Sequence, residues 1–129
     1  GVAMKKAMDL VQAAKAQITE VPATEAAAAI RASDVLIDVR EESEYAAGHI
    51  PGAIHASRGM LEFKLSGTPA LQRRDLAVLL YCKTSGRAAL AAQAMQAMGY
   101  VNVRSIAGGF DAWVAAGGEV ARPEQPRFD

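Results

Sequence analysis

Cys82 is the only cysteine in the chain, and its sequence setting favours a reactive thiolate. It follows Leu76–Tyr81, six residues without charge that predict a buried strand, and it precedes a helix predicted over Arg87–Met98. Unpaired amides and the dipole at a helix N-terminus stabilise a thiolate, and they can lower the pKa of a cysteine well below its usual value of about 8.5. We therefore expect Cys82 to act as a nucleophile.

The residues after Cys82 add groups that can hold an anion beside it, and we expect them to bind the substrate: Lys83, Thr84, Ser85, Gly86 and Arg87. They supply two cations, two hydroxyls and a glycine that lets the backbone approach closely. The loop amides are expected to form a cradle around the sulfur. From position alone, an inert cysteine that ends a core strand stays an open alternative.

Short apolar runs alternate with helical patterns along the rest of the chain. The predicted strands are Val35–Val39, a short one at Ile54, Leu76–Tyr81 and Val101–Ile106. The predicted helices are Met4–Ile18, Ala23–Ala32, Glu41–Ala47, Met60–Leu65, Arg87–Met98 and Asp111–Ala116. This alternation predicts an α/β fold, a single three-layer domain with a parallel sheet of about five strands flanked by helices. Ligands bind at the carboxyl ends of the strands in such sheets, which is where Cys82 lies.

Three local features of these elements can be predicted. The first helix is expected to pack on the domain, or else against another copy, through one apolar face: Met4, Met8, Val11 and Ile18. Thr24 is expected to cap the second helix. Ser66–Pro69 is expected to form a loop.

Composition excludes several classes of partner. Fourteen basic residues balance fourteen acidic ones, so no excess of charge favours nucleic acid or an anionic membrane. Apolar residues make up 51% of the chain, which is enough for a core, but no run approaches the roughly 18 residues of a membrane span. The sequence does not indicate the oligomeric state.

A single cysteine also limits the covalent chemistry. It excludes an intrachain disulfide, and with only His49 and His55 in support it disfavours a metal site. We expect no metal and no organic cofactor. A lone cysteine favours a reducing, cytoplasmic setting, although Gly1 at the first position is compatible with a removed leader.

Three segments resemble the motifs of the rhodanese family, and they occur in the family's order. Cys82–Arg87 resembles its six-residue active-site loop, C-x-x-x-x-R. Asp38–Tyr45 followed by Gly48–Ala53 resembles its upstream motif, and Gly108–Trp113 followed by Gly117 resembles its C-terminal motif. The resemblance covers a rhodanese-like domain (20–121), and the remaining segments are predicted to be an N-terminal helical extension (1–19) and a flexible tail (122–129).

The resemblance implies a sulfurtransferase that moves a sulfane sulfur from a small anionic donor, thiosulfate or a persulfide, to a thiol, cyanide or a sulfur-carrier protein. Cys82 would carry the sulfur as a persulfide between the two steps. Related dual-specificity phosphatases have a loop one residue longer, so the spacing from Cys82 to Arg87 disfavours phosphate. Two alternatives stay open: a non-catalytic rhodanese-fold module that relays sulfide signals, and a small cysteine-dependent phosphatase or arsenate reductase.

Other charged residues of these segments are expected to bind the donor or to support the site. Arg58 lies just past a predicted strand, where members of the family often place a basic residue that meets the anionic donor. Asp38 and Arg40 are expected to form a structural ion pair rather than to take part in the chemistry. Glu44 is expected to pair with Arg40 or with a neighbour.

The remaining site residues are expected to shape the backbone. His49 is interpreted as a brace that acts through its ring nitrogens rather than as a general base. Gly108 and Gly109 are expected to let their turn approach the active-site loop.

Overall fold

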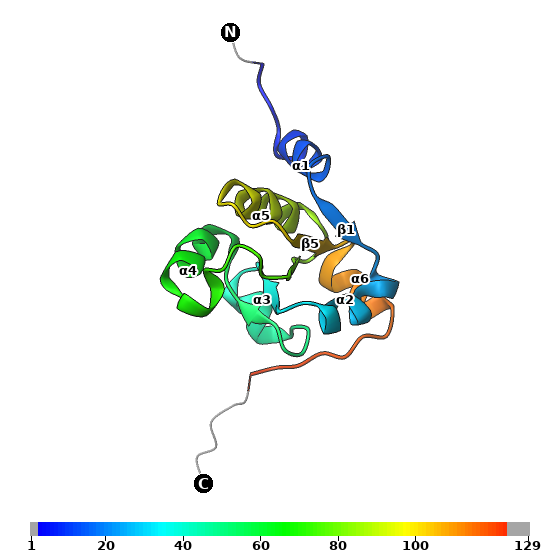
Figure 1. Cartoon of the computed structure of the whole chain (residues 1–129). Coiled ribbons are helices and arrows are strands. Elements are labelled where there is room, and N and C mark those ends of the chain that lie inside the picture. Colours follow the sequence, from blue (N-terminus) through cyan, green and yellow to red (C-terminus); the bar gives the residue numbers. More distant parts are fainter. Residues whose placement is uncertain (1–2, 124–129) are drawn as a thin grey trace.

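The computed structural model of the protein describes residues 3–123, which fold around one five-stranded parallel sheet. The strands, in their order across the sheet, are β1 (Thr19–Val21), β5 (Val103–Ile106), β4 (Val78–Tyr81), β2 (Val35–Asp38) and β3 (Ile54–His55). The α-helices are α1 (Ala7–Lys15), α2 (Ala26–Ala32), α3 (Glu42–Ala47), α4 (Leu61–Gly67), α5 (Gly86–Ala97) and α6 (Gly109–Ala115) (Figure 1). Short 3-10 helices are η1 (Ala23–Glu25), η2 (Arg58–Met60) and η3 (Pro69–Leu71). The predicted fold class and strand number are confirmed, and no helix within residues 3–123 is long and apolar enough to cross a membrane.

Helices cover both faces of the sheet and produce three layers. The face that meets α4 and α5 holds one buried cluster, which includes Ile37, Leu80 and Met95. The opposite face meets α2, α3 and α6 and holds a second cluster, which includes Leu79 and Tyr81. Successive side chains of β4 therefore alternate between two apolar layers, as expected for a strand covered on both sides.

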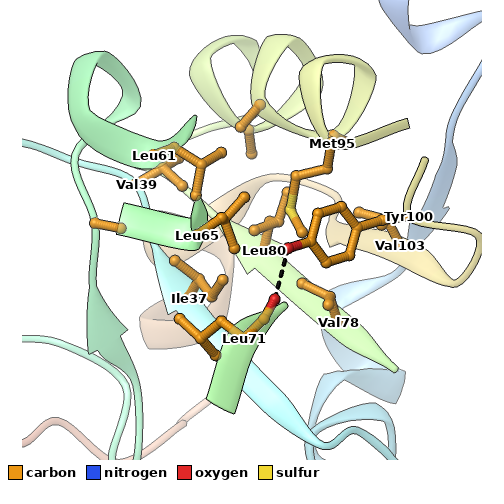
Figure 2. Close-up of a cluster of buried hydrophobic side chains, with 14 of the residues drawn as sticks. Ile37, Val39, Leu61, Leu65, Leu71, Val78, Leu80, Met95, Tyr100 and Val103 are labelled. Carbon is orange, nitrogen blue, oxygen red and sulfur yellow. Dashed lines mark hydrogen bonds between the residues drawn. The ribbon is translucent and has the colours of Figure 1, made fainter. Parts of the chain in front are cut away.

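Figure 2 shows the first cluster, in which Leu61 and Leu65 of α4 pack over the sheet. Tyr100 lies in the same cluster, and its hydroxyl donates to the carbonyl oxygen of Leu71 at 2.5 Å. A buried tyrosine needs such a partner for its polar end. Cys82 belongs to this cluster, so the packing of α4 and α5 fixes the position of its sulfur.

The N-terminal helix packs on the domain, as predicted, but only Val11 and Ile18 of the predicted apolar face lie at the contact. The helix α1 contacts α5, and its buried residues Val11 and Ala14 share a cluster with Ala89 (Figure 1). Met4 and Met8 were expected on the buried face and are exposed instead. Ala89 of α5 is buried in this contact and Gly86 lies close to Val11, so small residues of α5 let the two helices approach closely.

Two other local predictions were wrong. Thr24 does not cap α2, because the chain after Pro22 first forms the 3-10 turn η1, and Glu25 takes the capping position without a side-chain hydrogen bond. The loop expected at Ser66–Pro69 is shorter than predicted, because α4 continues to Gly67 and Pro69 then begins η3.

The C-terminal tail was predicted to be flexible over residues 122–129. Residues 124–129 lie outside the described residues, and Arg122 at the start of this range is bound. Its Nε donates to the carbonyl oxygen of Ala47 at 2.9 Å. The preceding residue, Ala121, pairs with His49 through two backbone hydrogen bonds.

Candidate active site

Cys82 lies directly after β4, and the loop that it begins leads into α5. This is the carboxyl edge of the sheet, where the sequence predicted it. The Cys82 residue is only 1% exposed, however, and it packs in the cluster that contains Leu61 and Ala88. The next residue, Lys83, is exposed. The sulfur therefore lies beneath the surface of the loop, and a donor must part the side chains above it.

The first two carbonyls of the loop are bound, whereas its amides are unbound. The amide of Phe110 donates to the carbonyl oxygen of Cys82 at 2.8 Å, and the amide of Asp111 donates to that of Lys83 at 3.0 Å. Within the described part of the chain, the amides of residues 83–88 donate to no backbone carbonyl. These N–H groups and the dipole of α5 are thus available to an anion. The cradle of amides around the sulfur stays a prediction, and the apolar burial of the sulfur was not predicted.

Two glycines let α6 approach the loop this closely. Gly108 and Gly109 have φ angles of 77° and 58°, in the left-handed region. A Cβ on Gly109 would overlap the carbonyl oxygens of Cys82 and Thr84, and one on Gly108 would lie 2.6 Å from the Cβ of Ala112. Both positions therefore require glycine, and the approach matches the one expected from the sequence.

Both cations of the loop are bound to carboxylates. Lys83 Nζ donates to Asp111 Oδ2 at 2.7 Å, at the surface. Arg87 donates to both carboxylate oxygens of Glu44, at 2.6 and 3.1 Å. These hydrogen bonds lower the pKa of Glu44 to about 2, and they raise the pKa of Arg87. The salt-bridge partner of Glu44 is therefore Arg87, and not Arg40.

Arg58 is the third cation predicted to meet the donor. It begins η2, and its amide donates to the carbonyl oxygen of Val39 at 2.9 Å, which places this turn at the carboxyl end of β2, next to β4. Its guanidinium donates to Glu62 at 2.9 Å. An anionic donor has to compete with a carboxylate at each of the three cations, Lys83, Arg87 and Arg58. The contact of these cations with substrate stays a prediction.

A buried ion pair supports the loop from the opposite face of the sheet. Arg40 donates to Asp38 through its amide and its guanidinium at 2.8–3.1 Å, and both residues are buried. The same guanidinium donates to the carbonyl oxygen of Gly48 at 2.6 Å, and its Cζ lies 4.3 Å from the centroid of the Phe110 ring. Burial and the Asp38 carboxylate raise the pKa of Tyr81, whose hydroxyl accepts a hydrogen bond from the amide of Ile50. The ion pair expected from the sequence is present.

His49 lies in the same region and makes bracing contacts. Its ring stacks on Tyr45 with the ring centroids 3.8 Å apart, and its Nδ1 lies 3.0 Å from the carbonyl oxygen of Tyr45. Its backbone pairs with Ala121. These contacts tie the end of α3 to the C-terminal segment, and they involve a ring nitrogen as expected.

One residue near the loop was not predicted. Lys15, the last residue of α1, donates from Nζ to the Ser85 Oγ at 2.7 Å. A Cβ on Gly86 would lie 3.5 Å from a methyl group of Val11, so α1 also closes against the start of α5. The hydrogen bond joins residues that are 70 positions apart, and no local spacing in the sequence indicates it.

A groove of about 450 Å³ opens beside the loop, and residues from α3 and α6 contribute to its walls. Lys83 and Phe110 line it, but Cys82 does not. The groove therefore lies along the exposed rim of the loop, whereas the sulfur is buried in the cluster on the α4 and α5 face.

Comparison with known proteins agrees with this fold. Residues 22–116 match the Rhodanese-like domain family, and the chain belongs to that family. A sulfurtransferase of Allochromatium vinosum is 30% identical over 90 residues, which are 70% of this chain and 80% of that protein.

Solved structures are similar over most of the chain. A Rhodopseudomonas palustris protein of unknown function, described as a possible tyrosine phosphatase, has a TM-score of 0.84 at 34% identity, with 94% of this chain and 98% of that chain covered. The human single-domain sulfurtransferase TSTD1 has a TM-score of 0.67 at 28% identity, with 74% and 95% covered. The family and its sulfurtransferase members support a sulfurtransferase-type role for this chain.

Proposed function

We propose that the chain is a rhodanese-type sulfurtransferase that takes a sulfane sulfur from thiosulfate, or from another small anionic donor, onto Cys82. It then passes this sulfur to a thiol or to cyanide. Family membership and the sulfurtransferase relatives support the proposal. The observation that carries it is the loop itself, in which the lone cysteine is followed by unbound amides while α6 binds the carbonyls of Cys82 and Lys83.

The first step of this reaction loads the cysteine. The Cys82 thiolate attacks the outer sulfur of thiosulfate, and the S–S bond of the donor breaks. Sulfite leaves with the bonding electron pair, and the new S–S bond holds the transferred sulfur as a persulfide on Cys82. The free amides after Cys82 stabilise the negative charge of the bound donor and of the persulfide.

The second step transfers the sulfur from Cys82 to the acceptor. Cyanide or an acceptor thiolate attacks the outer sulfur of the persulfide, and the S–S bond to Cys82 breaks. Thiocyanate or an acceptor persulfide leaves, and the Cys82 thiolate is restored with the bonding pair. One cysteine suffices for the cycle, and burial of Cys82 keeps water away from the persulfide between the steps.

A phosphatase is the second candidate, because the similar protein from Rhodopseudomonas palustris is described as a possible tyrosine phosphatase. Such a reaction needs a loop wide enough for the oxygens of a phosphoryl group. The six-residue spacing from Cys82 to Arg87 is the shorter type, and Arg87 is bound to Glu44. The loop length favours the sulfur donor, whereas the pairing of Arg87 with Glu44 hinders either anion.

Two assays on the full chain separate these functions. With thiosulfate and cyanide we expect steady formation of thiocyanate, and with an aryl phosphate we expect no release of phosphate. Intact-mass measurement after thiosulfate treatment should show a gain of one sulfur atom. Phosphate release without thiocyanate would overturn the proposal, and a folded protein inactive in both assays would be a non-catalytic module.

A further inference from the structure

Lys15 lies outside residues 22–116, the part of the chain that matches the family, yet it contacts the active-site loop. We propose that Lys15 is a positioning residue for the anionic sulfur donor and that it acts through the hydroxyl of Ser85. The inference rests on the proposed function and adds a residue to the same site.

The helix α1 is held against α5 in a way that fixes the position of Lys15. Val11 and Ala14 are buried in the contact with α5 (Figure 1). Just past the helix, Gln96 Nε2 of α5 donates to the carbonyl oxygen of Gln17 at 2.9 Å. The side chain of Lys15 is itself only 34% exposed. Its ammonium therefore reaches the loop from a packed base rather than from a free tail.

Lys15 differs from the other cations of the loop in its hydrogen-bond partner. Lys83 and Arg87 both donate to carboxylates, at 2.7 and 2.6 Å. Lys15 donates to a neutral hydroxyl, and the carboxylate of Glu20 lies 4.0 Å from its Nζ. Because Coulomb attraction falls with distance, the charge of Lys15 is less neutralised than the charges of the other two.

The hydroxyl of Ser85 can transmit this charge to the donor. Ser85 precedes the first residue of α5, and its side chain makes no capping hydrogen bond. By accepting from Lys15 it uses a lone pair and keeps its own proton free to donate. A hydroxyl that accepts from an ammonium is polarised and donates more strongly. A donor held at Cys82 therefore receives a hydrogen bond that Lys15 orients.

Steady-state kinetics with thiosulfate and cyanide test this role. Lys15→Met is expected to raise the KM for thiosulfate about tenfold with little change in kcat, because a charge-assisted hydrogen bond is lost. Lys15→Arg keeps the charge and a donor, and it should recover most of the difference. Lys5→Met removes an exposed lysine from the same N-terminal segment and should match the wild type. Glu20→Gln removes the nearby carboxylate and should lower the KM.

A double-mutant cycle tests the route through Ser85. Ser85→Ala should raise the KM by a similar factor, and Lys15→Met should add little in that background. An undiminished effect of Lys15→Met in the Ser85→Ala background would contradict the route. If the wild type transfers sulfur and Lys15→Met behaves as Lys5→Met does, this inference fails while the proposed function stands. A wild type without sulfur transfer contradicts the proposed function, and the role of Lys15 with it.

Discussion

Tyr81 and Cys82 are neighbours in the chain, yet they belong to opposite faces of the sheet and meet different chemistry. The Tyr81 face holds a buried network of charge around Asp38 and Arg40. The Cys82 face holds an apolar cluster of leucines, alanines and a methionine. Both faces are packed with apolar side chains, but the Tyr81 face adds a network of directional hydrogen bonds that, within residues 3–123, the Cys82 side of the loop lacks.

The difference indicates that the two faces beneath the loop serve different purposes, one for stability and one for the reaction. Breaking the polar network leaves a buried charge without its partner, which is costly, so that face should control stability. The apolar face contains the nucleophile, so the smallest chemical change there should affect the reaction more than the fold. The following changes test this contrast, from the largest expected effect to the smallest.

Cys82→Ser should have the largest effect, on activity. Replacing the sulfur with a hydroxyl is expected to lower sulfur transfer by at least about a thousandfold, because the nucleophile is lost. The cost to the free energy of unfolding should be only about 1–2 kcal/mol, for a hydroxyl in apolar surroundings. Thiocyanate formation and urea unfolding measure the two effects. An intact-mass gain of sulfur on the serine variant would show that another group carries it.

Asp38→Asn should affect mainly the stability of the fold rather than the activity. It leaves the buried guanidinium of Arg40 without its carboxylate, and we expect the free energy of unfolding to fall by about 3–5 kcal/mol. Urea unfolding measures this loss. Arg73→Met is the matched control, because it breaks the exposed pair with Asp75 and should leave the unfolding midpoint unchanged. Equal midpoints for the two variants would mean that the buried network contributes little.

Gly109→Ala should affect both properties, because this residue touches the loop. The new methyl group overlaps the carbonyl oxygens of the loop, and we expect a loss of about 2–3 kcal/mol in unfolding free energy. Sulfur transfer should fall about tenfold as the loop shifts. Gly117→Ala controls for the backbone, because φ there is 86° but no atom lies within 4 Å of the new Cβ. It should cost about 1 kcal/mol and leave activity intact.

Glu44→Gln should have the smallest effect, and the effect depends on pH. The folded-state pKa of Glu44 is lowered from 4.5 to about 2, so its pairing with Arg87 stabilises the fold above pH 4.5 and is lost as the pH falls toward 2. Because this pair is partly exposed, we expect about 1 kcal/mol at neutral pH. Urea unfolding of the wild type and of Glu44→Gln at neutral and acid pH measures this contribution. A difference that does not shrink in acid would mean that the carboxylate charge is not its source.

The sequence predicts the central strands well because burial on both faces leaves an uninterrupted apolar run, as in Val78–Tyr81. It misses the edge strand β1, Thr19–Val21, of which only Val21 is buried. It also predicts the position of the cysteine, since strand, loop and helix follow one another locally. It fails for contacts between distant segments. Arg87 meets Glu44 across 43 positions, and Lys15 meets Ser85 across 70, and only the folded topology brings these groups together.

The helix α1 shows the same limit for packing. Its predicted apolar face included Met4, Met8, Val11 and Ile18, but only Val11 and Ile18 of this face lie at the contact, together with Ala14. Which part of the face is buried depends on the residues of α5 that it meets, such as Ala89, and no property of α1 alone reveals this.

The burial of Cys82 also affects encounters between two copies of this protein. A disulfide requires two sulfur atoms to approach to about 2 Å, so both loops would have to open fully at once. Oxidative cross-linking between copies is thus sterically blocked at Cys82, while a small anion needs only a narrow opening. The fold therefore prevents its single thiol from forming a disulfide with the thiol of a second copy.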